Sequence, residues 1–130
     1  MIRLSRRQFE QIVLEAIEHL PQHLREAIHN VEIEIRPAPT REDFDYAAES
    51  GDVAPDDETL FGLYRGIPLT ERGASYDLVL PDLITIFQRP HEEACDRLDD
   101  LKAEVAVTVR HEIAHYFGID DDRLEELGAY

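Results

Sequence analysis

The chain has 130 residues, which is enough for one hydrophobic core, so we expect a single domain over residues 1–130. Its 29 acidic residues outnumber its 13 basic residues and give a net charge of −16, a field that repels nucleic acids and anionic membranes. The one cysteine, Cys95, excludes an internal disulfide, and no stretch reaches the roughly 18 apolar residues that span a bilayer. We therefore expect a cytoplasmic protein with no nucleic-acid partner and no membrane partner.

Residues 5–30 carry the pattern of two helices. Ser5 followed by Gln8 is a capping box, the signature of a helix N-terminus. Apolar residues then recur at helical spacing: Phe9, Ile12, Val13, Ala16, Ile17 and Leu20. Pro21 interrupts this helix, and a second, short helix is predicted to end near Asn30.

The middle of the chain predicts strands separated by loops. Residues 31–36 alternate apolar with charged side chains, which is the period of a half-buried strand. Residues 37–58 are rich in proline and acidic residues without a sustained period, so we predict a long loop, with Phe44 and Tyr46 as its contacts to the body. Strand-like runs follow at residues 60–65, 76–80 and 83–88.

The C-terminal part of the chain is predicted to be helical. Pro90 marks a helix start, and apolar residues keep helical spacing over residues 94–117. Asp99 and Asp100 are predicted to break this region into two helices. Residues 122–127 are long enough for a final short helix.

The segment His-Glu-Ile-Ala-His at residues 111–115 carries the candidate chemistry. On a helix, His111 and His115 lie one turn apart on the same face, so their imidazoles converge in the way that a tetrahedral zinc accepts. Glu112 follows the first histidine, where its carboxylate reaches a water at the metal without binding the metal itself. This is the position of a general base, so the pattern predicts a hydrolytic zinc site.

A third protein ligand is needed to complete such a site. Gly118 comes three residues after His115, where a left-handed glycine ends a helix and lets the chain turn back. Asp121 comes three residues later and gives the spacing HExxHxxGxxD, so we predict Asp121 as the third zinc ligand. Neighbouring carboxylates are alternatives for this role: Asp120, Asp122 and Glu125.

The segment resembles the signature of the minimal zincins, a family of small bacterial zincin-like metallopeptidases, and the metzincin motif with Asp in place of its third His. GLYRGIPLTERG (residues 62–73) and LPDLITIFQRP (residues 80–90) are similar to the family's other recurrent stretches. The resemblance implies a compact α+β domain with two N-terminal helices, a small mixed sheet of three or four strands, and a C-terminal active-site helix followed by a short helix. It also implies one Zn²⁺ held by His111, His115 and Asp121, with peptides or proteins as substrates.

The hypothesis is therefore a zinc metallopeptidase in which Glu112 takes a proton from the attacking water and passes it to the leaving amine. Peptide substrates commonly pair with an edge strand at such sites, and residues 83–88 are predicted to be that edge because Pro81 and Pro90 bracket them. The residue that stabilises the oxyanion stays open among Tyr64, Tyr76, Tyr116, Tyr130, Arg110 and Arg123. The other histidines show no ligand spacing and are expected to be solvated: His19, His23, His29 and His91.

Two other functions stay open. The first is a catalytically idle metal-binding or peptide-binding regulatory module, because Met1 is the only methionine and the methionine turn beneath the metal of metzincins is lacking. The second is a metal-dependent RNase, since a bacterial RNA-processing family uses a His-x3-His-x5-His site in a similarly small domain. That family has no Glu after its first His, and a net charge of −16 suits RNA poorly, so Glu112 favours the peptidase.

Overall fold

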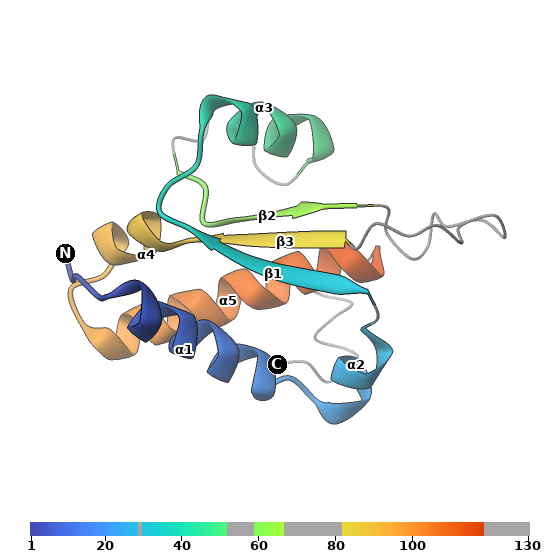
Figure 1. The fold of residues 1–130 in the computed structure, drawn as a ribbon, viewed down its shortest axis with the longest axis horizontal. Coiled ribbons are helices and arrows are strands. Elements are labelled where there is room, and N and C mark those ends of the chain that lie inside the picture. Colours follow the sequence, from blue (N-terminus) through green and yellow to red (C-terminus); the bar gives the residue numbers. More distant parts are fainter. Residues whose placement is uncertain (29, 52–58, 67–81, 119–130) are drawn as a thin grey trace, which may run out of the picture.

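The computed structural model describes residues 1–28, 30–51, 59–66 and 82–118 (Figure 1). Its elements, in chain order, are α1 (Arg6–Glu18), α2 (Gln22–Ala27), β1 (Val31–Arg36), α3 (Arg41–Ser50), β2 (Gly62–Arg65), β3 (Asp82–Phe87), α4 (Gln88–Ala94) and α5 (Leu98–Phe117). Helices with one small mixed sheet match the α+β class expected from the sequence. Among these elements, no helix combines the length and the apolar character that spanning a bilayer requires.

Both predicted N-terminal helices are present. The Ser5 hydroxyl accepts a hydrogen bond from the Gln8 backbone N–H, and the Gln8 side chain accepts one from the Ser5 N–H. This capping box satisfies N–H groups that the start of α1 would otherwise leave without a partner. The second helix, α2, ends at Ala27, and Asn30 then takes the left-handed conformation (φ 57°) that asparagine tolerates better than most residues.

The three strands form one sheet in the order β1-β3-β2. Strand β1 runs parallel to β3, with Val31 opposite Asp82, and β2 runs antiparallel to β3, with Gly62 opposite Ile86. In the sheet that the described residues form, β3 is therefore central and β1 and β2 are the edges. The strand predicted at residues 76–80 lies outside the described residues.

The prediction that residues 83–88 form an edge strand is wrong, because β3 pairs on both sides. Proline cannot donate to a ladder, but neither flanking proline falls inside the paired stretch. Pro81 precedes Asp82, the first paired residue, and Pro90 lies in α4. The two prolines therefore do not decide the position of the strand in the sheet.

The main hydrophobic core lies between the sheet and the helices α1 and α5 (Figure 1). The sheet contributes Ile35, Tyr64, Ile84 and Ile86, and the helices contribute Phe9, Ile12, Val13, Leu101, Val105, Val109, Ile113 and Tyr116. Full burial of one large apolar side chain is worth about 1.5–3 kcal/mol. This layer therefore holds α5, which carries the candidate site, firmly against the sheet.

Part of the predicted loop at residues 37–58 is a helix, α3, so that prediction is wrong over residues 41–50. Thr40 and Asp43 form a second capping box, and Gly51 ends the helix in the left-handed conformation, with φ at 81°. The prediction that Phe44 and Tyr46 contact the body is confirmed. Both pack against a small second core made of Ala47, Leu60, Leu63 and Phe87.

Asp43 links α3 to both edge strands. It is only 2% exposed, and its carboxylate forms ion pairs with Arg36 at the end of β1 and with Arg65 at the end of β2. Burial raises the pKa of Asp43, but hydrogen bonds from Thr40, Arg65 and Arg36 outweigh it and hold the pKa below the ordinary value. The carboxylate therefore stays charged near neutral pH, and its two ion pairs attach α3 to the sheet.

The break between the two C-terminal helices lies before the predicted position. The chain leaves helical geometry at residues 95–97, whereas Asp99 and Asp100 belong to the first turn of α5. Carboxylates in a first turn interact favourably with the positive end of the helix dipole. The two aspartates therefore support the start of α5 and do not interrupt it.

Candidate metal centre

The long helix α5 carries the His-Glu-x-x-His segment in its last two turns. Its inward face is buried through a run of apolar residues that ends with Ile113 and Tyr116. Gly118 caps the helix in the left-handed conformation (φ 70°), and its N–H points back to the carbonyls of Ala114 and His115. The predicted helix end at Gly118 is therefore observed, three residues after the second histidine.

The imidazoles of His111 and His115 face each other. Their Nε2 atoms lie 3.3 Å apart, and their ring centroids are 4.9 Å apart with an angle of 76° between the planes. Two nitrogens bound at ~2.0–2.1 Å to one tetrahedral zinc lie about 3.3–3.4 Å apart. The spacing of the two nitrogens therefore fits two ligands of one zinc without rearrangement of the helix.

Glu112 points from the same helix toward the sheet. It is 1% exposed, whereas both histidines are partly accessible. Its Cγ atom lies against the backbone of Gly62 in β2, at 3.2 Å from the place where a Cβ on that glycine would stand. The Glu112 side chain therefore packs at the junction of α5 and β2, and the residue before it, His111, carries the first imidazole.

Tyr64 lies next to the second imidazole and is hydrogen-bonded to Asp82. The ring of Tyr64 is stacked on that of His115, with 6.4 Å between centroids, and its hydroxyl donates to the Asp82 carboxylate at 2.5 Å. A phenol has one proton to donate, and here that proton is directed at Asp82. In this arrangement Tyr64 is better placed to support the His115 ring than to donate to an oxyanion.

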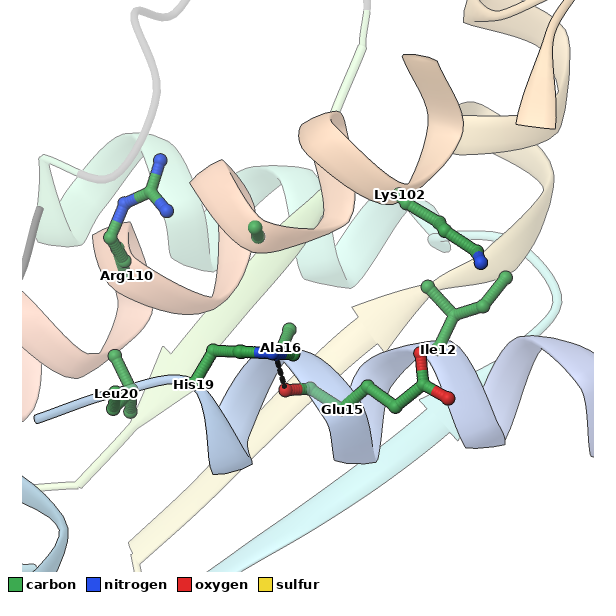
Figure 2. Close-up of a pocket in the computed structure, with 8 residues that line it drawn as sticks. Ile12, Glu15, Ala16, His19, Leu20, Lys102 and Arg110 are labelled. Atoms are coloured by element: carbon green, nitrogen blue, oxygen red, sulfur yellow. Dashed lines mark hydrogen bonds between the residues drawn. The ribbon is translucent and has the colours of Figure 1, made fainter. Parts of the chain in front are cut away.

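Two of the other oxyanion candidates also lie in the described part of the chain. Tyr116 is fully buried in the main core. Arg110 lines a groove of about 200 Å³ between α1 and α5, together with Lys102, Glu15 and His19 (Figure 2). This groove opens on the flank of α5 that faces α1. Tyr76, Tyr130 and Arg123 lie outside the described residues.

The predicted third ligand, Asp121, lies outside the described residues, as do its alternatives Asp120, Asp122 and Glu125. Within residues 1–28, 30–51, 59–66 and 82–118, no three His, Cys, Asp or Glu side chains are grouped to hold a metal ion. The structure thus brings the imidazoles of His111 and His115 together, Glu112 lies between these residues on the same helix, and the assignment of Asp121 stays a prediction.

The expectation of solvated histidines is confirmed for His19 and His23, which are exposed, and is wrong for His91. His29 lies outside the described residues. His91 is 0% exposed and lies between the rings of Phe9 and Phe61. Burial lowers its pKa to about 4, although a hydrogen bond to the Phe87 carbonyl acts in the opposite direction.

Comparison with known proteins bears directly on this site. A model of the family described as zincin-like metallopeptidase matches residues 28–129, a span that includes both histidines, Glu112 and Asp121. A search of curated proteins found no match. Because the family match covers well over half of the sequence, the chain belongs to the zincin-like metallopeptidase family.

Proposed function

We propose that this protein is a zinc-dependent peptidase whose metal is held by His111, His115 and Asp121. The observation that carries the proposal is the 3.3 Å spacing of the two Nε2 atoms, with the carboxylate of Glu112 on the next residue of the same helix. Two imidazoles and one carboxylate are a common protein ligand set of catalytic zinc. Membership of a metallopeptidase family supports the same assignment.

Glu112 is the proposed general base. Zinc, when bound at this site, supplies a Lewis acid that lowers the pKa of water to about 7 and polarises the substrate carbonyl. Glu112 takes the proton of the attacking water and delivers it to the leaving amine. Its burial at the junction with β2 keeps the carboxylate in one place and limits competing contacts with solvent.

Strand β2 takes over the substrate-pairing role that the sequence assigned to residues 83–88. The Phe87 N–H donates to the Phe61 carbonyl at 2.9 Å, which makes this a hydrogen-bonded pair. Such pairs alternate in antiparallel ladders, so Gly62 and Tyr64 direct their backbone groups away from β3. A peptide added along this edge would contact the two residues that lie against Glu112 and His115.

The charge of the chain favours neutral or cationic peptides as substrates. A net charge of −16 attracts basic segments and repels acidic ones. The attraction acts over about 10 Å at 0.1 M salt, so it should weaken as salt rises. Cleavage of a Lys- or Arg-rich peptide is therefore expected to be more salt-sensitive than cleavage of a neutral one.

The test combines metal analysis with a cleavage assay. The full chain, purified without added metal, should contain about one zinc, and it should cleave members of a broad peptide library. Glu112→Gln should keep the zinc and lower cleavage by roughly 10²–10⁴-fold, as loss of a general base does. Glu104→Gln, two turns earlier on α5, is the matched control and should cleave like the parent.

Three outcomes would contradict the peptidase. One zinc per chain with no cleavage that depends on Glu112 would leave a metal-binding module without peptidase activity. Absence of zinc from the parent chain, and failure to bind added zinc, would remove the metal site itself. Cleavage of RNA that depends on Glu112 would instead favour the RNase.

A further inference from the structure

Gly62 of β2 packs against α5 with no space for a side chain. A Cβ atom added at Gly62 would lie 2.7 Å from Thr108 Cγ2, and 3.2 Å from both Glu112 Cγ and the Thr85 carbonyl oxygen. Carbon atoms pack at about 3.5–4.0 Å, so none of these contacts leaves space for a side chain. The backbone of Gly62 has no positive φ, so this glycine is required by space and not by conformation.

Thr108 lies on the same face of α5 as Glu112, one helical turn earlier. Both side chains are buried, and both lie against the same glycine of the edge strand. The methyl group of Thr108 therefore acts as the spacer between α5 and β2 immediately beside the proposed general base.

His91 fixes the orientation of this threonine. Its Nδ1 lies 2.6 Å from the Phe87 carbonyl oxygen, and its Nε2 lies 2.8 Å from the Thr108 hydroxyl. A carbonyl only accepts, so Nδ1 carries the proton and Nε2 of the neutral ring accepts from Thr108. The same hydroxyl also donates to the Glu104 carbonyl at 3.0 Å, so its single proton is shared between two acceptors, Nε2 and this carbonyl. With the hydroxyl held there, the methyl group is directed at Gly62.

We infer that Gly62, Thr108 and His91 form a spacer that sets the distance between the edge strand β2 and the carboxylate of Glu112. They are positioning residues for the peptidase, and this inference rests on the proposed function. Substrate paired along β2 is placed by the strand, whereas Glu112 is placed by the helix. Gly62 contacts both Thr108 and Glu112, so it connects the strand to the helix. This contact therefore sets the distance between the attacked carbonyl and the base.

The test is a double-mutant cycle on the full chain. Gly62→Ala should push β2 away from α5, and a displacement near 1 Å at a reacting centre costs on the order of tenfold to a hundredfold in kcat. Thr108→Ser removes the methyl group and keeps the hydroxyl, so Gly62→Ala combined with Thr108→Ser should recover most of the loss. Thr108→Val keeps the methyl group and should give no recovery. Zinc content and KM should change little in all variants.

Crystal structures of the same variants test the spacer without relying on peptidase activity. The separation between Gly62 Cα and Glu112 Cγ should widen in Gly62→Ala and return in the combination with Thr108→Ser. If the parent shows no cleavage dependent on Glu112, the peptidase fails, and these separations alone decide whether the spacer exists. Recovery of kcat by Thr108→Val as fully as by Thr108→Ser would overturn the inference, as would an unchanged kcat in folded Gly62→Ala.

A second arm covers the case in which Gly62→Ala does not fold. On the native Gly62 background, Thr108→Ser opens a gap of one methyl group beside Glu112, whereas Thr108→Val keeps the methyl group and leaves no gap. We expect kcat to fall severalfold for the serine variant and to stay closer to the parent for the valine variant. If kcat falls more for the valine variant than for the serine variant, the hydroxyl of Thr108 matters more to the site than its methyl group does. That result would overturn the role of the methyl group as the spacer.

Discussion

The ring of Tyr64 lies parallel to the imidazole of His115, with 15° between their planes and 6.4 Å between their centroids. The hydroxyl of Tyr64 is fixed by Asp82, which stands at the start of the central strand β3. A predicted zinc ligand is thus supported by a ring whose far end is anchored in the sheet. Groups that orient metal ligands in this way commonly affect metal affinity as well as folding.

Substitutions of Tyr64 should separate these two effects. Tyr64→Phe keeps the ring and removes a donor to a buried carboxyl group, so the free energy of unfolding should fall by about 1–3 kcal/mol while zinc affinity stays near that of the parent. Tyr64→Leu also removes the ring and should lower zinc affinity on the order of tenfold. Urea unfolding and competitive zinc titration measure the two quantities. Equal zinc affinity in Tyr64→Leu and the parent would show that the ring does not orient His115.

Burial of His91 should make stability fall in mild acid. Its pKa of about 4 in the folded state lies below the ordinary 6.5, so between these values the unfolded chain binds a proton that the folded chain does not. Stability therefore rises with pH over this window and is lost as pH falls from about 6.5 toward 4. The full difference is worth about 3 kcal/mol. Urea unfolding at a series of pH values should show this slope.

A variant pair isolates the contribution of His91 from that of other groups. His91→Gln cannot titrate, so its stability should depend less on pH between 4 and 6.5, although it should be less stable near neutral pH because a packed ring is lost. His19→Gln changes an exposed histidine on α1 and should keep the slope of the parent. An unchanged slope in His91→Gln would show that this ring is already protonated, or accessible, in the folded state.

The arrangement of the two histidines was predictable because its geometry is local. His111, Glu112 and His115 belong to one helix, and helical spacing alone places the two imidazoles on one face. The end of that helix at Gly118 follows from the low cost of a left-handed glycine. For these residues, whose partners lie within one helical turn, the sequence was sufficient.

The errors at His91 and at β3 involve partners from distant parts of the chain. The burial of His91 is tolerated because Thr108 and the Phe87 carbonyl form hydrogen bonds with its two ring nitrogens. No spacing pattern in the sequence predicts the contact with Thr108. The helix α3 had a usable signal in the pair Thr40 and Asp43, a capping box that the surrounding acidic and proline residues obscured. The central position of β3 depends on pairing with both β1 and β2, which strand periodicity does not reveal.

Asp43→Asn tests the attachment of α3 to the sheet. Asparagine cannot form the ion pairs with Arg36 and Arg65, so the free energy of unfolding at pH 7 should fall by about 2 kcal/mol. The pKa of Asp43 is lowered by folding, so its contribution is present above about pH 4 and is lost as pH falls through the folded pKa. The difference between the variant and the parent should therefore shrink in acid.

The matched control for this prediction lies two residues further along the same helix. Asp45 forms an exposed ion pair with Arg41 at 3.9 Å, and such pairs contribute little. Asp45→Asn should therefore unfold like the parent at every pH. A loss for Asp45→Asn equal to that for Asp43→Asn would mean that the charge of α3 matters, and that its contacts with the strands do not.

Removal of metal should destabilise the chain if His111, His115 and Asp121 bind zinc. A ligand that binds only the folded state adds about 2.7 kcal/mol of stability at a concentration 100 times its Kd, so a chelator should lower Tm and added zinc should restore it. His111→Ala and Asp121→Ala should each abolish the response to zinc. Asp120→Ala and Asp122→Ala are matched controls on either side of the proposed ligand and should keep it. If the Tm response to zinc disappears in Asp122→Ala and persists in Asp121→Ala, the third ligand is Asp122 and not Asp121. If the response survives His111→Ala, zinc binds elsewhere.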